Sequence, residues 1–140
     1  MKKILVAIEI SRQGGNDTAI KTAQIIAKAM DGEIVLLSVI EQVPNFVSVQ
    51  LPEGLREEQV QDAKNKLQNL AAQYKCSNAV IREGQPATEI LEYAREIKAN
   101  LIVIHSHDPN IATYFIGSVA SRVVRHAHCS VHVVRLPEKE

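Results

Sequence analysis

One short segment of the sequence has the residue types and spacing of a phosphate-binding site. Gly117, Ser118, Val119 and Ala120 stand where a helix is expected to begin. The first N–H groups of a helix have no acceptor within the helix and lie at the positive end of its dipole, so they bind anions well. The Ser118 hydroxyl adds a donor. A simpler interpretation stays open, in which Gly117 only permits a tight turn and Ser118 caps the helix.

A metal site formed by histidines is a second chemical possibility. Imidazole and thiolate side chains suit zinc or copper, and His105 and His107, two apart on an extended segment, would point the same way. His126 and His128 stand where a helix is expected to end, and a cation there interacts favourably with the helix dipole. We prefer this structural role and assign no metal ligands. The residues concerned gather late in the chain: His105, His107, His126, His128, His132 and Cys129.

Catalytic groups are harder to find. No Ser-His-Asp order, Walker lysine or pair of catalytic carboxylates occurs in a recognised context. Arg122 and Arg125, three residues apart, share one helix face and either reach a phosphate or remain solvated or paired with a carboxylate. We therefore expect no dedicated enzyme, and at most slow turnover of a bound ligand.

The elements that must position these residues alternate along the chain. Apolar runs without polar alternation are typical of strands covered on both faces, and helical spacing of apolar residues separates them. Such an alternation predicts a doubly wound α/β fold, with a parallel sheet of five strands and helices on both faces. The expected strands cover residues 3–9, 33–40, 77–82, 101–104 and 131–134, and the expected helices cover about 16–30, 55–74, 86–97 and 117–127.

The ends of several elements carry local signals. Asn16 or Asp17 can cap the first helix, and Gly32 is expected to stop it. Gly84 turns the chain, and Pro86 suits the first turn of the next helix. Residues 41–54 form the longest irregular stretch, which is either a functional loop or a connector.

Ligands of doubly wound sheets bind beyond the carboxyl ends of the strands, near the point where the strand order reverses. Three strand exits therefore define the expected site, and they lie on one edge of the sheet. They comprise Ala7-Ile8-Glu9-Ile10-Ser11, Ser38-Val39-Ile40 and Ile104-His105-Ser106-His107-Asp108.

Length and composition narrow the class of protein. A chain of 140 residues with 46% apolar residues suits one globular domain, 1–140. Lysine plus arginine equals aspartate plus glutamate, so we expect neither nucleic-acid nor membrane binding. No apolar run approaches the length of a membrane span, and Glu9 interrupts the first apolar run before it reaches the length of a signal peptide. Cys76 and Cys129 form no metal-binding or disulfide pattern. A cytoplasmic location is expected.

These residues resemble the universal stress protein family over almost the whole chain. The resemblance is carried by the opening Lys3 to Glu9, by Leu101 to Ile104, and above all by Gly117 to Val134. The run from Ser106 to Tyr114 before Gly117-Ser118 looks most like the F and G types. The family implies a five-stranded sheet of order 3-2-1-4-5, a homodimer paired through the last strand, Val131 to Val134, and in many members bound ATP.

Two departures from the ATP-binding pattern of the family stand out. Its Gly-x2-Gly-x9-Gly-Ser/Thr motif is matched only at the end, because His105 and Asp108 replace glycines and the loop is one residue shorter. An aspartate there repels phosphate unless Mg²⁺ intervenes or the side chain turns away. Glu9 stands where ATP-binding members usually have Asp. The F-type relatives share the shorter loop, and the resemblance implies that they bind ATP nonetheless.

The resemblance assigns roles to particular residues. Glu9 would reach a ribose hydroxyl or the adenine amino group, unless it is only a solvated carboxylate, and the Val39 backbone would contact adenine. His107 and the amides from Gly117 to Ala120 would hold phosphate. The function expected is an ATP-binding stress-response module, with a nucleotide-independent dimer acting through protein partners as the alternative. The full set of expected ligand contacts is Ala7, Ile8, Glu9, Val39, Ile104, His105, Ser106, His107, Gly117, Ser118, Val119 and Ala120.

Overall fold

Strands and helices alternate along the chain in the structure, a computed structural model that describes residues 1–10, 16–41, 54–106 and 117–135. This alternation confirms the α/β class. In chain order the elements are β1 (Lys2–Ala7), α1 (Asn16–Met30), β2 (Gly32–Ile40), α3 (Leu55–Gln73), β3 (Asn78–Glu83), α4 (Pro86–Glu96), β4 (Leu101–His105), α5 (Ser118–His126) and β5 (Ser130–Val134).

The five strands form one parallel sheet in the order β3-β2-β1-β4-β5. This order is the one that the family resemblance implied. β1 lies in the centre, where Val6 is in register with Leu36 of β2 on one side and with Val103 of β4 on the other. The strand order therefore reverses beside β1, because the chain adds β2 and β3 on one side and β4 and β5 on the other.

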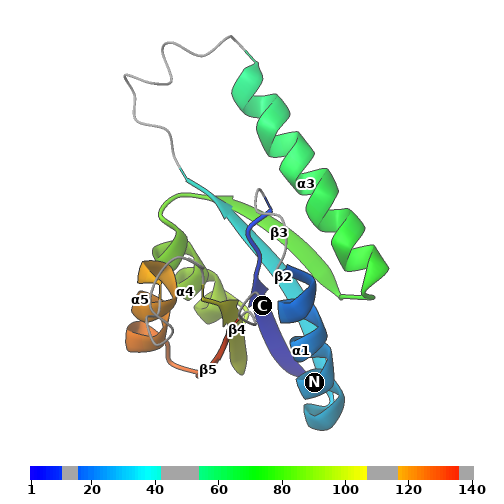
Figure 1. Cartoon of the computed structure of the whole chain (residues 1–140), viewed down its shortest axis with the longest axis vertical. Coiled ribbons are helices and arrows are strands. Elements are labelled where there is room, and N and C mark those ends of the chain that lie inside the picture. Colours follow the sequence, from blue (N-terminus) through cyan, green and yellow to red (C-terminus); the bar gives the residue numbers. More distant parts are fainter. Residues whose placement is uncertain (11–15, 42–53, 107–116, 136–140) are drawn as a thin grey trace, which may run out of the picture.

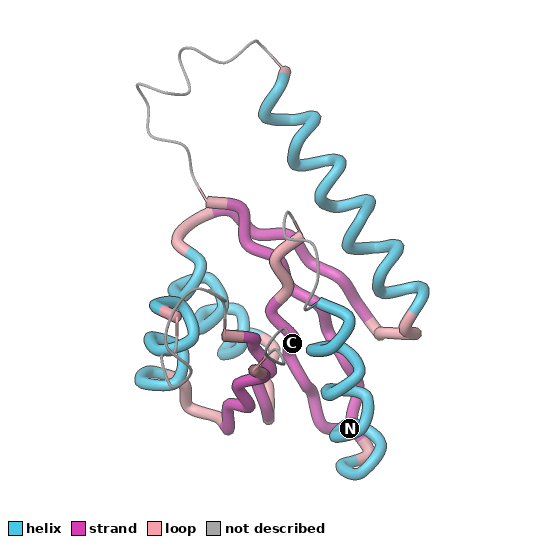
Figure 2. The backbone as a smooth tube through the Cα atoms, in the orientation of Figure 1, coloured by secondary structure: helices cyan, strands magenta, loops and turns pink. Residues whose placement is uncertain are grey.

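Two helices cover each face of the sheet. Figures 1 and 2 show α1 and α3 on one side of the strands and α4 and α5 on the other. Side chains of β1 alternate between the two layers: Ile4 and Val6 pack in the core under α1 and α3, and Leu5 and Ala7 in the core under α4 and α5. Burial on both faces explains why the strands read as uninterrupted apolar runs.

The element ends confirm some of the expected signals and correct others. Gly84 has φ 148°, and Pro86 occupies the first turn of α4 behind the cap Gln85, whose side chain accepts the Thr88 N–H at 2.8 Å. Gly32 does not stop α1, because the helix ends at Met30 and Asp31 takes the left-handed conformation, φ 55°. Gly32 opens β2, where an added Cβ would lie 3.2 Å from the Lys2 carbonyl oxygen.

No helix in the described part of the chain is long and apolar enough to cross a membrane.

Candidate ligand-binding site

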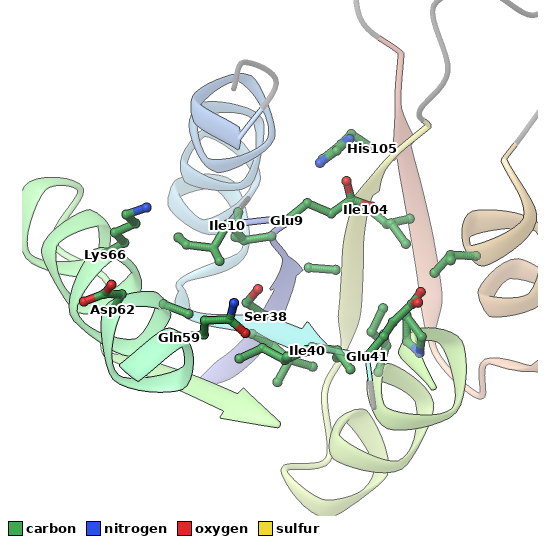
Figure 3. A pocket seen from close by; sticks show the side chains of 18 residues that line it. Glu9, Ile10, Ser38, Ile40, Glu41, Gln59, Asp62, Lys66, Ile104 and His105 are labelled. Atoms are coloured by element: carbon green, nitrogen blue, oxygen red, sulfur yellow. The ribbon is translucent and has the colours of Figure 1, made fainter. Parts of the chain in front are cut away.

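A cavity of about 610 Å³ opens at the carboxyl ends of β1, β2 and β4 (Figure 3). It lies beside β1, where the strand order reverses, which is where ligands of doubly wound folds bind. Its volume is within the range typical of small-molecule sites. The described lining residues are Ala7, Ile8, Glu9, Ile10, Leu37, Ser38, Val39, Ile40, Glu41, Gln59, Asp62, Ala63, Lys66, Pro86, Ile90, Ile104, His105 and Val119.

The exit of β1 brings Ala7, Ile8 and Glu9 to the cavity. The Ile8 N–H donates to the Leu37 carbonyl of β2 at 2.8 Å, so the chain continues along the sheet past the last residue of β1. Asn16 is already helical and does not act as the expected cap; its side chain contacts the backbone of Glu9 instead, through Nδ2 to the carbonyl oxygen at 2.9 Å. The first turn of α1 thereby holds the Glu9 backbone beside the cavity.

The exit of β2 supplies the opposite wall. Val39 lines the cavity as expected, next to Ser38, which is only 2% exposed, and Glu41 follows the end of the strand. Figure 3 shows Ser38, Ile40 and Glu41 below Glu9 across the opening. An apolar strand end beside acceptor groups suits a flat heterocycle with exocyclic donors.

The exit of β4 brings in Ile104 and His105, which are 5% and 3% exposed and line the cavity. Ser106 is not among the lining residues; its N–H donates to the Val134 carbonyl of β5 at 2.9 Å, which extends the sheet by one residue. His107, the expected phosphate contact, lies outside the described residues.

The N-terminus of α5 lies beside the cavity through Val119, the second residue of the helix. Gly117 is the N-cap, so Ser118 does not cap the helix as the simpler interpretation required. The Gly117 torsions, φ −58° and ψ 159°, are open to any residue, so the turn itself does not demand glycine. The Ser121 N–H donates to the Gly117 carbonyl at 2.9 Å, which leaves the N–H groups of residues 118–120 without helical acceptors.

Of the expected contacts, Gly117, Ser118 and Ala120 do not line the cavity, although Val119 between them does. A helix presents successive residues 100° apart, so one side chain of the first turn faces inward while its neighbours face elsewhere. Their N–H groups, which point along the helix axis, are the parts that matter for an anion.

The sequence analysis missed one complete wall of the cavity. Gln59, Asp62, Ala63 and Lys66 of α3 line it, and Figure 3 shows the three polar side chains projecting from that helix opposite Glu9 and His105. These residues are spaced so that they lie on one face of the helix, and this spacing could have predicted that they share one surface. The spacing did not predict the wall, because polar residues on an amphipathic helix are ordinarily expected to face solvent.

Arg56 attaches the start of α3 to the sheet. Its Nη2 donates to the carbonyl oxygen of Glu41 at 3.2 Å and to Oε1 of Glu83 at 3.1 Å. Glu41 follows β2 and Glu83 ends β3, so a single guanidinium joins α3 to two strand ends. This contact helps to hold the α3 wall beside the β2 wall.

The histidine-rich end of the chain forms no metal site within the described residues, where no group of three His, Cys, Asp or Glu side chains converges. Burial raises the pKa of the Cys129 thiol, which opposes the thiolate form that metals bind. Arg122 and Arg125 are exposed, and neither lines the cavity.

The sequence has relatives whose names agree with the resemblance. A model of the universal stress protein family matches residues 1–135. Universal stress protein MJ0531 of Methanocaldococcus jannaschii is 33% identical over 150 residues, which cover 99% of this chain and 85% of that protein. Universal stress protein G of Escherichia coli O157:H7 is 31% identical over 141 residues, which cover 96% of this chain and 99% of that protein.

Solved structures agree on the fold. A protein described as hypothetical protein MJ0577 has a TM-score of 0.81 at 24% identity and covers 99% of this chain and 98% of its own. A universal stress protein in complex with cAMP has a TM-score of 0.59 at 20% identity, with 96% of each chain covered. Because the family model spans nearly the whole sequence and two relatives exceed 30% identity over most of their lengths, the chain belongs to the universal stress protein family.

Proposed function

We propose that this protein is a stress-response regulatory module that binds an adenine nucleotide, with ATP as the nucleotide that the family resemblance implies. The observation that carries the proposal is the cavity at the reversal of strand order, with apolar strand ends and the Glu9 carboxylate on one side and the first turn of α5 on another. The structure of another family member in complex with cAMP supports an adenine ligand for this fold.

The proposed pose follows from the chemistry of the walls. Adenine lies against the exit of β2 with the Val39 backbone as its hydrogen-bonding partner, and Glu9 accepts from a ribose hydroxyl. The phosphate end points toward Val119, where the first N–H groups of α5 supply donors and a positive dipole end. Ile8 and Ile104 enclose the ligand between these ends.

We propose binding as the main role and turnover as slow at most. Among the described residues, no group of three His, Cys, Asp or Glu side chains converges to hold a metal ion, and the sequence contains no recognised catalytic triad. A magnesium ion would therefore enter together with the phosphates of the nucleotide. We propose that the protein acts in the cytoplasm and that its regulatory state depends on whether the nucleotide is bound.

The first test is the nucleotide content of freshly purified protein, followed by calorimetric titration of the emptied protein with ATP and Mg²⁺. We expect released adenine nucleotide or saturable binding. Gly117→Asp should abolish binding, because a carboxylate at the N-cap repels phosphate from the N–H groups of α5. Gly117→Ala is the matched control, since its torsions suit alanine and it brings no charge. An empty protein that ignores every adenine nucleotide would overturn the proposal.

We also propose that the protein forms a homodimer paired through β5. The same dimer is expected under the alternative function, in which the protein acts through protein partners and without a nucleotide. β5 is one of the two edge strands of the sheet. The Val134 carbonyl accepts from Ser106 on the β4 side, so the backbone groups of Val131 and Val133 face outward. Such an edge needs a cover.

Val131→Pro tests this edge, because it removes an outward N–H donor while sparing the pairing with β4. Light scattering should report a dimer for the wild type and a monomer for the folded variant. A wild-type monomer at high concentration would contradict the dimer.

A further inference from the structure

The charges around the cavity are unusual for a site that holds a polyphosphate. Among the described lining residues, Glu9, Glu41 and Asp62 carry carboxylates, whereas Lys66 is the one lysine or arginine. Figure 3 shows these groups on separate walls, with Asp62 and Lys66 on α3, Glu41 after β2 and Glu9 after β1. The described lining of the cavity thus carries more negative than positive charge.

Two of these carboxylates have no ion-pair partner among the described residues. Asp62 and Glu41 are exposed, and neither side chain forms an ion pair with any described residue. Arg56 lies nearby, but it contacts the carbonyl oxygen of Glu41 and pairs with the carboxylate of Glu83. Lys66, one turn after Asp62, makes no ion pair within the described chain either. These charges therefore remain available to a ligand.

The segments that connect the described elements contain few cationic residues in the sequence. Residues 42–53, between β2 and α3, contain Glu53 and no lysine or arginine. Residues 107–116, between β4 and α5, contain Asp108 and likewise no lysine or arginine, and residues 11–15 contribute one arginine, Arg12. The positive end of α5 corresponds to only about half a charge. Among the described residues, Lys66 and the start of α5 supply a positive charge that matches one phosphate group better than three.

Building on the proposed adenine site, we propose that the cavity selects its ligand by charge. It binds adenosine compounds with no phosphate or a single phosphate charge most tightly, and it accepts a triphosphate only as a complex with a divalent cation. Asp62 and Glu41 are the residues that set this preference, because their carboxylates lie on the walls of the same cavity and repel additional phosphates. Lys66 acts in the opposite sense.

Calorimetric titration of emptied, full-length protein with four probes tests this preference: adenosine, cyclic AMP, ATP with EDTA, and ATP with Mg²⁺. We expect adenosine and cyclic AMP to bind at least about tenfold more tightly than ATP with EDTA, which carries about four negative charges. Mg²⁺ should strengthen ATP binding and leave adenosine binding unchanged. Added salt should also strengthen metal-free ATP binding, because it screens repulsion.

Charge variants on the lining assign the effect to residues. Asp62→Asn and Glu41→Gln should each tighten metal-free ATP binding by about three- to tenfold and change adenosine binding less than about twofold. Lys66→Gln should weaken ATP binding by a similar factor. Glu58→Gln is the matched control, because it removes the same charge from α3 at an exposed residue that does not line the cavity.

The outcomes separate this inference from the proposed function. The charge preference is wrong if metal-free ATP binds as tightly as adenosine. It is also wrong if Asp62→Asn and Glu41→Gln bind ATP no differently from Glu58→Gln. Either result would leave the proposed adenine site intact. If none of the four probes binds to folded protein, the proposed function fails and the charge preference fails with it.

Discussion

The side chain of Asn16 bonds both backbone groups of Glu9. Its Nδ2 donates to the Glu9 carbonyl oxygen at 2.9 Å, and its Oδ1 accepts the Glu9 N–H at 3.3 Å. These two bonds join the start of α1 to the exit of β1 across seven residues of sequence. A lining residue of the cavity is thereby positioned by an amide that lies outside it.

Asn16→Ala should therefore lower both stability and ligand affinity. The loss of two partly buried hydrogen bonds predicts a decrease of about 1–2 kcal/mol in the free energy of unfolding. Urea denaturation measures this decrease, provided that the slope of the free energy against urea concentration is the same for both proteins. Titration with adenosine measures whether the loss of the Glu9 contacts also weakens ligand binding. Thr18→Ala, in the same turn of α1, is the control. Equal urea midpoints for Asn16→Ala and the wild type would show that the two bonds contribute nothing.

Arg56→Ala should weaken ligand binding more than it weakens the fold. Its ion pair with Glu83 is partly exposed, with side-chain exposures of 28% and 45%, so we expect a stability loss below about 1 kcal/mol. The α3 wall, however, loses its connection to the ends of β2 and β3. Calorimetry with adenosine should show a several-fold weaker affinity.

Glu83→Gln separates the two contacts of Arg56. It removes the ion pair and retains the bond from Arg56 to the Glu41 carbonyl, so it should weaken adenosine binding less than Arg56→Ala does. Unchanged affinity in Arg56→Ala would show that α3 is held in place by its apolar face alone.

Arg82 is expected to stabilise the fold without affecting the site. Its Nε pairs with Glu89 at 2.9 Å, its Nη1 pairs with Glu96, and its guanidinium lies 5.5 Å from the centre of the Tyr93 ring. The hydrogen bond to Glu96 and the charges of both glutamates raise the pKa of Arg82. Arg82→Ala should lower the free energy of unfolding by about 1–2 kcal/mol.

Arg82→Lys should recover only part of that loss, because an ammonium cannot reproduce the fork of the guanidinium on two carboxylates. Arg82 does not line the cavity, so adenosine affinity should stay unchanged in both variants. Full recovery of the urea midpoint by lysine would contradict the two-carboxylate geometry.

Cys76 is predicted to be an unreactive thiol. It packs at the edge of the core under α1 and α3, and burial raises its pKa from 9.0 to about 11. The thiolate fraction below pH 9 is then about 100-fold smaller than for an ordinary thiol, so alkylation by iodoacetamide should be slower by about that factor. A Cys129→Ala background isolates the reaction of Cys76. Rapid modification of the folded protein at neutral pH would contradict this prediction.

The same pKa shift makes stability depend on alkaline pH. The folded state keeps Cys76 protonated while the unfolded chain ionises near pH 9, so the contribution is complete below that pH and is lost between about pH 9 and 11. Cys76→Ala should flatten this part of the profile of urea midpoint against pH. An equally steep profile in Cys76→Ala would assign the alkaline loss to other groups.

Sequence patterns predicted the elements well because each depends on nearby residues. Burial on both faces makes a strand such as Leu101–His105 read as a continuous apolar run, and Pro86 behind Gln85 starts α4 through local geometry. Asp31 shows the limit of such signals. It takes the left-handed conformation at the end of α1, one residue before the glycine expected to stop the helix, whereas Gly32 lies in β2 close to the backbone of Lys2.

The sequence by itself determined the α/β class, the edge of the sheet where the cavity opens, and several residues that line it, including Glu9, Val39 and His105. These follow from short-range patterns and from the rule that parallel strands end on one side. Only the tertiary structure decided that Asp62 and Lys66 of α3 face the cavity, and that Asn16 holds Glu9. Polar side chains on a helix carry no local signal for what lies opposite them, since that depends on how the helix packs across the sheet.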